Sequence, residues 1–249
     1  MAASMQGDGP ERCSHTLDPE RWEREHDEPC QIDPKDDADI LETGDGRQVW
    51  RCPHAATKAH DKCVFHLQPD EKPEDTDSVE EFLAIVDGER DALDGDGQRP
   101  PQFIGSIFEG LDINRERFGD GKTIDLRHAR VGRMVWRVNI IDAPINASGA
   151  VIEGICECGD VTFQSDVLFK SAHFEYKTSF ADPTYSFASR SGKLVTLFDE
   201  QKYQGTIFNG VPYFSALSST NKLIFRALSL IMNPTLTRQD LTRRLRLNM

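Results

Sequence analysis

Large apolar side chains recur at five-residue intervals through the second half of this chain, and that spacing constrains its fold more than any other feature. The series runs Leu126, Val131, Trp136, Ile141, Asn146, Val151, Cys156 and Val161, with one polar member, and passes to Phe163, Phe169, Phe174, Phe180, Phe208 and Phe214. An α-helix repeats every 3.6 residues and a strand every two, so neither produces this spacing. A solenoid whose rungs stack on one another does. We therefore predict columns of large side chains inside a mainly β solenoid.

The same interval begins upstream, at Phe103, Phe108, Ile113 and Phe118. A small residue often stands two positions before the large one, as at Ala129 and Gly154. The pattern resembles the pentapeptide-repeat family. Residues 106–110, 129–133 and 163–180 carry the resemblance, which covers roughly Phe103 to Phe214 and extends more loosely to Leu241. The resemblance implies a right-handed β-helix of square cross-section with four repeats per turn. Its large residues would point inward and its small residues would fit the corners. Cys156 would then face inward, and Cys158 outward.

The remaining segments suggest a smaller module in front of the solenoid. Asp18 before Pro19 predicts a short helix reaching about His26, because Asp is a good N-cap and Pro suits the first helical position. A second helix is predicted from Asp77 to Asp87, with one apolar face, and it could cap the solenoid end. We predict disorder over 1–10, a Cys/His zinc module over 11–68, a linker with the capping helix over 69–102, the solenoid over 103–235, and a basic tail or cap over 236–249.

Cysteines and histidines gather ahead of the repeats. No export signal is visible, so a cytoplasmic location is expected, where thiols stay reduced and clustered Cys and His are more often metal ligands than disulfides. A segment of about fifty residues with few apolar side chains can hardly fold alone without a bound metal or a similar cross-link. We predict a structural zinc ion held by four residues: Cys13, Cys30, Cys52 and Cys63. The alternative set pairs Cys52 and Cys63 with His54 and His66, and the absence of Cys-x2-Cys pairs leaves both sets open.

Charge is divided unevenly along the chain, which carries a net charge of −13. Residues 1–120 hold 31 acidic and 13 basic side chains, whereas residues 121–249 hold 11 and 16. The acidic excess, with few lysines, suggests a salt-adapted (halophilic) source. Some proteins of the pentapeptide-repeat family modulate topoisomerases by imitating DNA with an acidic solenoid. The predicted solenoid has the opposite sign here, which disfavours mimicry and leaves direct binding through the basic tail as the nucleic-acid alternative.

No arrangement typical of catalysis is apparent: there is no Ser/His/Asp set, phosphate-binding glycine loop or paired-carboxylate motif. No run of about 18 apolar residues suggests a membrane span. The sequence therefore favours a non-catalytic solenoid scaffold that mediates protein–protein interaction with an unidentified partner. Nucleic acid and membrane are not expected partners, and a homodimer through a solenoid end is conceivable. The two alternatives are the nucleic-acid-related role and, less favoured, a zinc-dependent enzyme.

Overall fold

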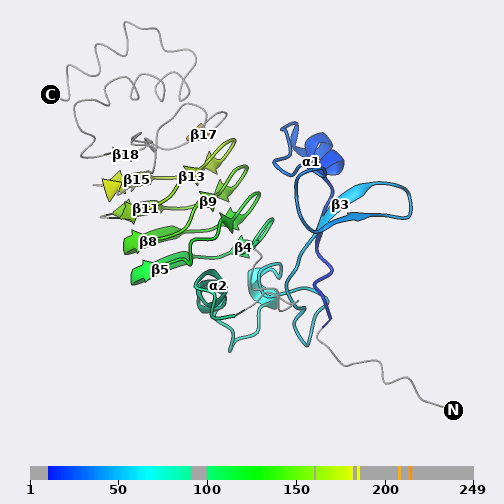
Figure 1. Cartoon of the computed structure of the whole chain (residues 1–249), viewed down its shortest axis with the longest axis horizontal. Coiled ribbons are helices and arrows are strands. Elements are labelled where there is room, and N and C mark those ends of the chain that lie inside the picture. The colour runs from blue at the N-terminus through cyan, green and yellow to red at the C-terminus, as the bar shows by residue number, and fades with distance from the viewer. Residues whose placement is uncertain are drawn as a thin grey trace, which may run out of the picture.

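Parallel strands, stacked coil upon coil, form the described structure from residue 107 onward (Figure 1). It is a computed structural model that describes residues 11–90, 100–159, 161–181, 184–185, 207–208 and 213–214. The described part is mainly β, with two α-helices, so the predicted stacked β-solenoid is confirmed. The expectations for residues 1–10, for most of 91–101, for most of the predicted solenoid after residue 181 and for 236–249 fall outside the described residues, as do the side chains of Phe180, Phe208 and Phe214.

Three parallel sheets run along the stack. The first contains β4 (Ile107–Phe108), β7 (Arg130–Val131), β10 (Val151–Ile152), β14 (His173–Phe174) and β17 (Ile207–Phe208). The second contains β5 (Leu111–Phe118), β8 (Met134–Ile141), β11 (Cys156–Gly159), β12 (Thr162–Phe163), β15 (Thr178–Ala181), β16 (Thr184–Tyr185) and β18 (Tyr213–Phe214). The third contains β6 (Ile124–Asp125), β9 (Ile145–Asn146) and β13 (Val167–Leu168). The coils starting at residues 101, 124, 145 and 167 are called the first to fourth coils below.

The coil length explains where the five-residue spacing holds and where it fails. Among the first four coils, strand pairs match residues 21 to 23 positions apart, such as Ile107 with Arg130 and Arg130 with Val151, whereas β14 pairs with β17 at 34 positions, His173 with Ile207. This exceeds four five-residue repeats, so the predicted series slips. Asn146 and Val151, predicted to be inward members, are half-buried, and Ile145 and Ile152 are buried instead.

The inward columns follow the strand register. One column consists of Phe108, Val131, Ile152 and Phe174, each at most 1% exposed. Trp136 and Phe169 are also buried, as predicted. The outward prediction for Cys158 is wrong: it is 1% exposed and pairs in register with Trp136. Within a strand, alternate residues share a face, so Cys158 lies on the inner face with Cys156.

Each coil makes the same tight turn before its strand in the first sheet. Four hydrogen bonds of the i+3 to i type close these turns, from Ser106, Ala129, Ala150 and Ala172 to the residues three positions earlier. The third residue of every turn has positive φ, and these residues are Gly105, His128, Gly149 and Ser171. A left-handed third residue is typical of a type II turn. The small residue that follows is fully or almost fully buried, because the corner has no room for a larger side chain.

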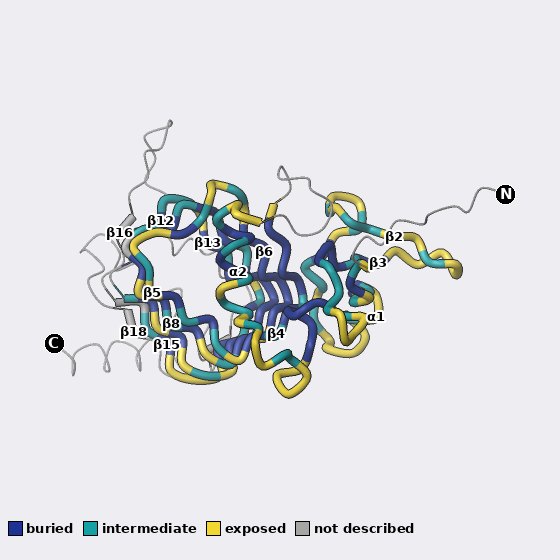
Figure 2. Tube along the Cα trace, turned by 90° about the horizontal axis from the view of Figure 1, so that it is seen from below, coloured by how far each residue is buried: buried dark blue, intermediate teal, exposed yellow. Residues whose placement is uncertain are grey.

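Both helices form where the sequence predicts them. Helix α1 (Pro19–His26) is capped by Asp18, whose carboxylate accepts from the Arg21 amide. Helix α2 (Ser78–Val86) is capped by Asp77. Its apolar face meets the first coil, where the Phe82 ring lies 4.7 Å from that of Phe103. Viewed along the stack, α2 lies across the end of the coil (Figure 2).

The N-terminal segment folds beside the solenoid into a small antiparallel sheet of β1 (Thr16–Leu17), β3 (Gln48–Arg51) and β2 (Ile40–Glu42), followed by a short 3-10 helix η1 (Pro69–Glu71). It shares one apolar core with the coils, running from Cys13 to Phe174. A buried ion-pair network also joins the two parts, because Arg127 of the second coil bonds both Asp125 and Asp37.

Candidate metal centre

Two strands of the small sheet bring the first two thiols together. β1 pairs antiparallel with β3, so the residues flanking them lie side by side: the Cys52 amide donates to the His15 carbonyl at 3.0 Å. The Cys13 amide donates to the His54 carbonyl at 2.9 Å. Cys13 precedes β1 and Cys52 follows β3, so the pairing of these two strands brings the two thiols to the same side-chain cluster.

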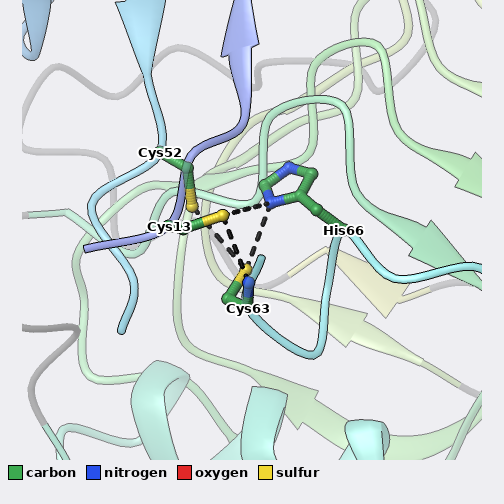
Figure 3. Close-up of side chains that lie close together, drawn as sticks. All are labelled: Cys13, Cys52, Cys63 and His66. Atoms are coloured by element: carbon green, nitrogen blue, oxygen red, sulfur yellow. Dashed lines mark hydrogen bonds between the residues drawn. The ribbon is translucent and has the colours of Figure 1, made fainter. Parts of the chain in front are cut away.

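A single tight turn supplies the other two groups. The His66 amide donates to the Cys63 carbonyl at 3.0 Å, which closes the Cys63–Val64–Phe65–His66 turn. The turn brings His66 Nδ1 to 3.1 Å from Cys63 Sγ. Figure 3 shows the four side chains of Cys13, Cys52, Cys63 and His66 pointing toward one another. Their ligand atoms all lie within 4.8 Å of one another, and all four residues are buried.

Two of the separations match those expected around one tetrahedral ion. Zinc–sulfur bonds of about 2.3 Å and zinc–nitrogen bonds of about 2.0–2.1 Å put the ligand atoms of a tetrahedral site roughly 3.5–3.8 Å apart. The Cys52 and Cys63 sulfurs are 3.7 Å apart, as are Cys13 Sγ and His66 Nδ1, whereas Cys63 Sγ and His66 Nδ1 are closer, at 3.1 Å. All three cysteines are free thiols. The four groups can therefore hold one metal ion between them.

Surrounding groups fix the tautomer and plane of the His66 ring. Nε2 lies 2.9 Å from the Ile104 carbonyl oxygen, which can only accept, so Nε2 carries the proton and Nδ1 presents its lone pair to the thiols. A carbonyl partner on the far ring nitrogen is the usual support of a metal-binding histidine. His15 stacks on the same ring at 3.8 Å, which limits its rotation.

The thiols perturb one another strongly. Hydrogen bonds from the Cys52 and Cys63 thiols hold the pKa of Cys13 far below its ordinary value. Burial, reinforced by the Cys13 charge, raises the pKa of Cys63 to about 12, and burial also raises the pKa of Cys52. These opposite directions favour the negative charge on Cys13, and a bound divalent ion would lower the pKa of all three thiols. Backbone amides already point at two sulfurs, from Cys63 to Cys13 at 3.2 Å and from His54 to Cys52 at 3.4 Å.

The structure brings together three of the four predicted cysteines and one of the two alternates, His66. Cys30 lies elsewhere, with its sulfur 3.5 Å from His128 Nε2 on the second coil. His54 also turns away from the sulfurs, because its Nε2 lies 2.6 Å from the Gln102 carbonyl oxygen. The Cys63-x2-His66 spacing was the usable signal for His66, since that spacing closes within one turn. The sequence gives no comparable signal that separates Cys13 from Cys30.

No family model, curated protein or solved structure matches the chain. The resemblance to pentapeptide-repeat proteins therefore stays a prediction from spacing. Within the described residues, neither helix has the length and apolar character needed to cross a membrane.

Proposed function

We propose that this protein is a non-catalytic solenoid scaffold whose N-terminal module is held by a structural zinc ion. The observation that carries the proposal is the closed donor set formed by Cys13, Cys52, Cys63 and His66. These residues are 0–2% exposed, and their three sulfurs and one nitrogen lie within 4.8 Å of one another, which supplies the four ligands of a closed site. Structural zinc sites have four protein ligands, whereas catalytic sites leave one position for water or substrate. Thiolate-rich sets also favour zinc over the hard cations magnesium and calcium.

The metal proposal is tested by zinc content. The purified full chain should contain about one zinc per chain. Cys63→Ser should lose most of it, because one of three thiolates is gone. Cys30→Ser is the matched control, since Cys30 lies against His128 and should leave the zinc content unchanged. Equal zinc loss in the two variants would refute the ligand set, and a parent chain free of zinc after expression with zinc would refute the site.

The scaffold role is supported by the outer surface of the coils. Exposed arginines there pair with acids of neighbouring coils: Arg133 with Asp112, Arg130 with Glu153, and Arg137 with Glu157. Arg130 lies on the first sheet and Arg137 on the second, and an outer surface that carries both charge signs, including the face with Arg133 and Arg137, suits a polar protein partner. It does not favour phosphate binding, because each of these three arginines already has a carboxylate nearby. We therefore rank protein binding above the nucleic-acid role and above a zinc enzyme.

A charge-reversal comparison tests this face. Proteins cross-linked to the full chain should be lost when Arg133→Glu and Arg137→Glu are combined. They should be retained with Arg21→Glu, a control on exposed helix α1. An unchanged set of cross-linked proteins in the double variant would refute the role of this face. Salt-sensitive binding of a DNA duplex by the parent, lost in the double variant, would favour the nucleic-acid role instead.

A further inference from the structure

The coils of the first sheet are joined by one repeated hydrogen bond. At matched positions, the amides of Arg130, Val151 and His173 donate to the carbonyls of the preceding coil, each at 2.8 Å. Ile107 holds this position in the first coil, which has no coil before it. Its amide donates to the Phe65 carbonyl at 2.7 Å. Phe65 thus replaces the acceptor that a preceding coil would supply, and it lies inside the Cys63–His66 turn.

A second kind of hydrogen bond between coils recurs in the third sheet and in the corner turn. Its direction is the reverse of the first: a carbonyl of one coil accepts from an amide of the preceding coil. At one position the acceptors are Asp125, Asn146 and Leu168, at 2.7–2.8 Å. Gln102 is the first-coil equivalent, since it bridges to Asp125, and its carbonyl accepts from His54 Nε2 at 2.6 Å.

The corner position behaves in the same way. The acceptors in later coils are the carbonyls of Arg127, Ser148 and Lys170, which receive the amides of Gly105, His128 and Gly149. The first-coil equivalent is Ile104, and its carbonyl accepts from His66 Nε2 at 2.9 Å. Two imidazole N–H groups therefore occupy the places of two backbone N–H groups of a missing coil.

Apolar side chains and a lysine complete the cover. The Phe65 ring lies 4.9 Å from Phe103 and 5.9 Å from Phe108, and Phe82 of α2 packs against the same two rings. Lys72 Nζ donates to the Ile107 carbonyl at 2.7 Å. The strand edge and the apolar interior of the first coil are thus both covered, which matters because an open edge is a template for pairing with another chain.

We propose that the Cys/His module is a metal-dependent cap that takes the place of a coil before the first, and that metal removal opens this edge to pairing with a second copy of the chain. The metal dependence rests on the proposed zinc site. His66 connects metal binding to capping, because its Nδ1 faces the thiols while its Nε2–H donates to the Ile104 carbonyl of the first coil. Phe65 also connects the metal site to the cap. Its carbonyl, which accepts from the Ile107 amide, is positioned by the turn that begins at Cys63 and ends at His66, both proposed zinc ligands.

Amide exchange measured by NMR on the full chain tests the cap. With zinc bound, the Ile107 amide should exchange about as slowly as its equivalents, Arg130 and Val151. After treatment with a zinc chelator, exchange at Ile107 should accelerate at least about tenfold relative to Arg130 and Val151. A protected Ile107 amide in the zinc-free chain would overturn the cap, as would equal acceleration at all three positions.

Light scattering on the same samples tests self-association. The zinc-bound chain should be monomeric, and the chelated chain should form dimers or larger species that return to monomer when zinc is restored. A zinc-free chain that stays monomeric, or one that aggregates irreversibly, would overturn the self-association.

A second variant keeps the cap testable apart from the zinc site. His54→Phe retains a ring against Phe65 and Phe103 but removes the donor to Gln102, and His54→Gln restores a donor. His54→Phe should retain zinc yet speed exchange at Ile107 and promote self-association, with rescue by His54→Gln. Identical behaviour of the two variants would overturn the cap. If the chain binds no zinc, the proposed function fails, while this comparison still decides whether the module is a cap.

Discussion

Gly132 is the position where the stacking of coils can be tested most sharply. A Cβ built on Gly132 would lie 2.4 Å from the Glu109 carbonyl oxygen on the coil below, and one on Gly154 would lie 2.2 Å from the Gly132 carbonyl oxygen. Both obstructions are backbone atoms, which no side-chain rotation can move. Reaching even 3.0 Å at Gly132 requires the coils to separate by about 0.6 Å. That movement stretches the 2.8 Å bond from the Gly132 amide to the Phe108 carbonyl.

Overpacking of this kind costs about 1–3 kcal/mol. In a chain of this size, each kcal/mol lowers the melting temperature by roughly 2–4 °C. Gly132→Ala should therefore melt several degrees below the parent in thermal unfolding followed by circular dichroism. Gly159→Ala is the control, because a Cβ there meets no atom within 4 Å. Removing chain entropy from the unfolded state should leave this control as stable as the parent or slightly more stable. Equal melting temperatures for the two variants would refute coil-on-coil contact at Gly132.

Three further predictions address the core, the docking of the module and pH. Phe174→Asp should abolish cooperative unfolding, because Phe174 is 0% exposed and a buried unpaired charge costs several kcal/mol; a retained cooperative melt would contradict the inward column. Arg127→Met should destabilise the chain by about 3–5 kcal/mol in urea unfolding, since two carboxylates lose their partner, whereas exposed Arg130→Met should cost at most about 1 kcal/mol; equal losses would contradict the buried network. Burial lowers the pKa of His128 to about 3, so this residue contributes stability above its unfolded pKa of about 6.5 that is lost as pH falls toward 3. His128→Asn tolerates the left-handed turn and should flatten stability against pH over that range, and an unchanged slope would refute the assignment.

The sequence predicted the stacked fold because inward residues must be large and must recur. It could not predict the coil length of 21 to 23 residues. A series of inward residues that advances by five positions at some steps and by six at others still looks like a five-residue repeat with errors. Val151 and Ile152 are adjacent and both apolar, so only the strand register decides which one is buried. Within β8, residues 134, 136 and 138 alternate inward, and this two-residue pattern is hidden by the apolar Val135 and Ile140.

A Cys/His cluster ahead of the coils was predictable, as were three of the four residues that the structure brings together. Choosing between Cys30 and His66 requires knowing that Cys30 lies beside the second coil, which depends on the docking of Asp37 and Gln31 against Arg127. The cap was beyond prediction for a similar reason. Its donors and acceptor replace backbone groups of a coil that the chain does not contain, and no sequence pattern marks them.

X-ray absorption spectroscopy of the zinc-loaded full chain tests the central claim most directly. The account predicts three sulfur ligands at about 2.3 Å and one nitrogen ligand at about 2.0–2.1 Å, from Cys13, Cys52, Cys63 and His66. A first shell of four sulfurs, or one containing water oxygen, would contradict it.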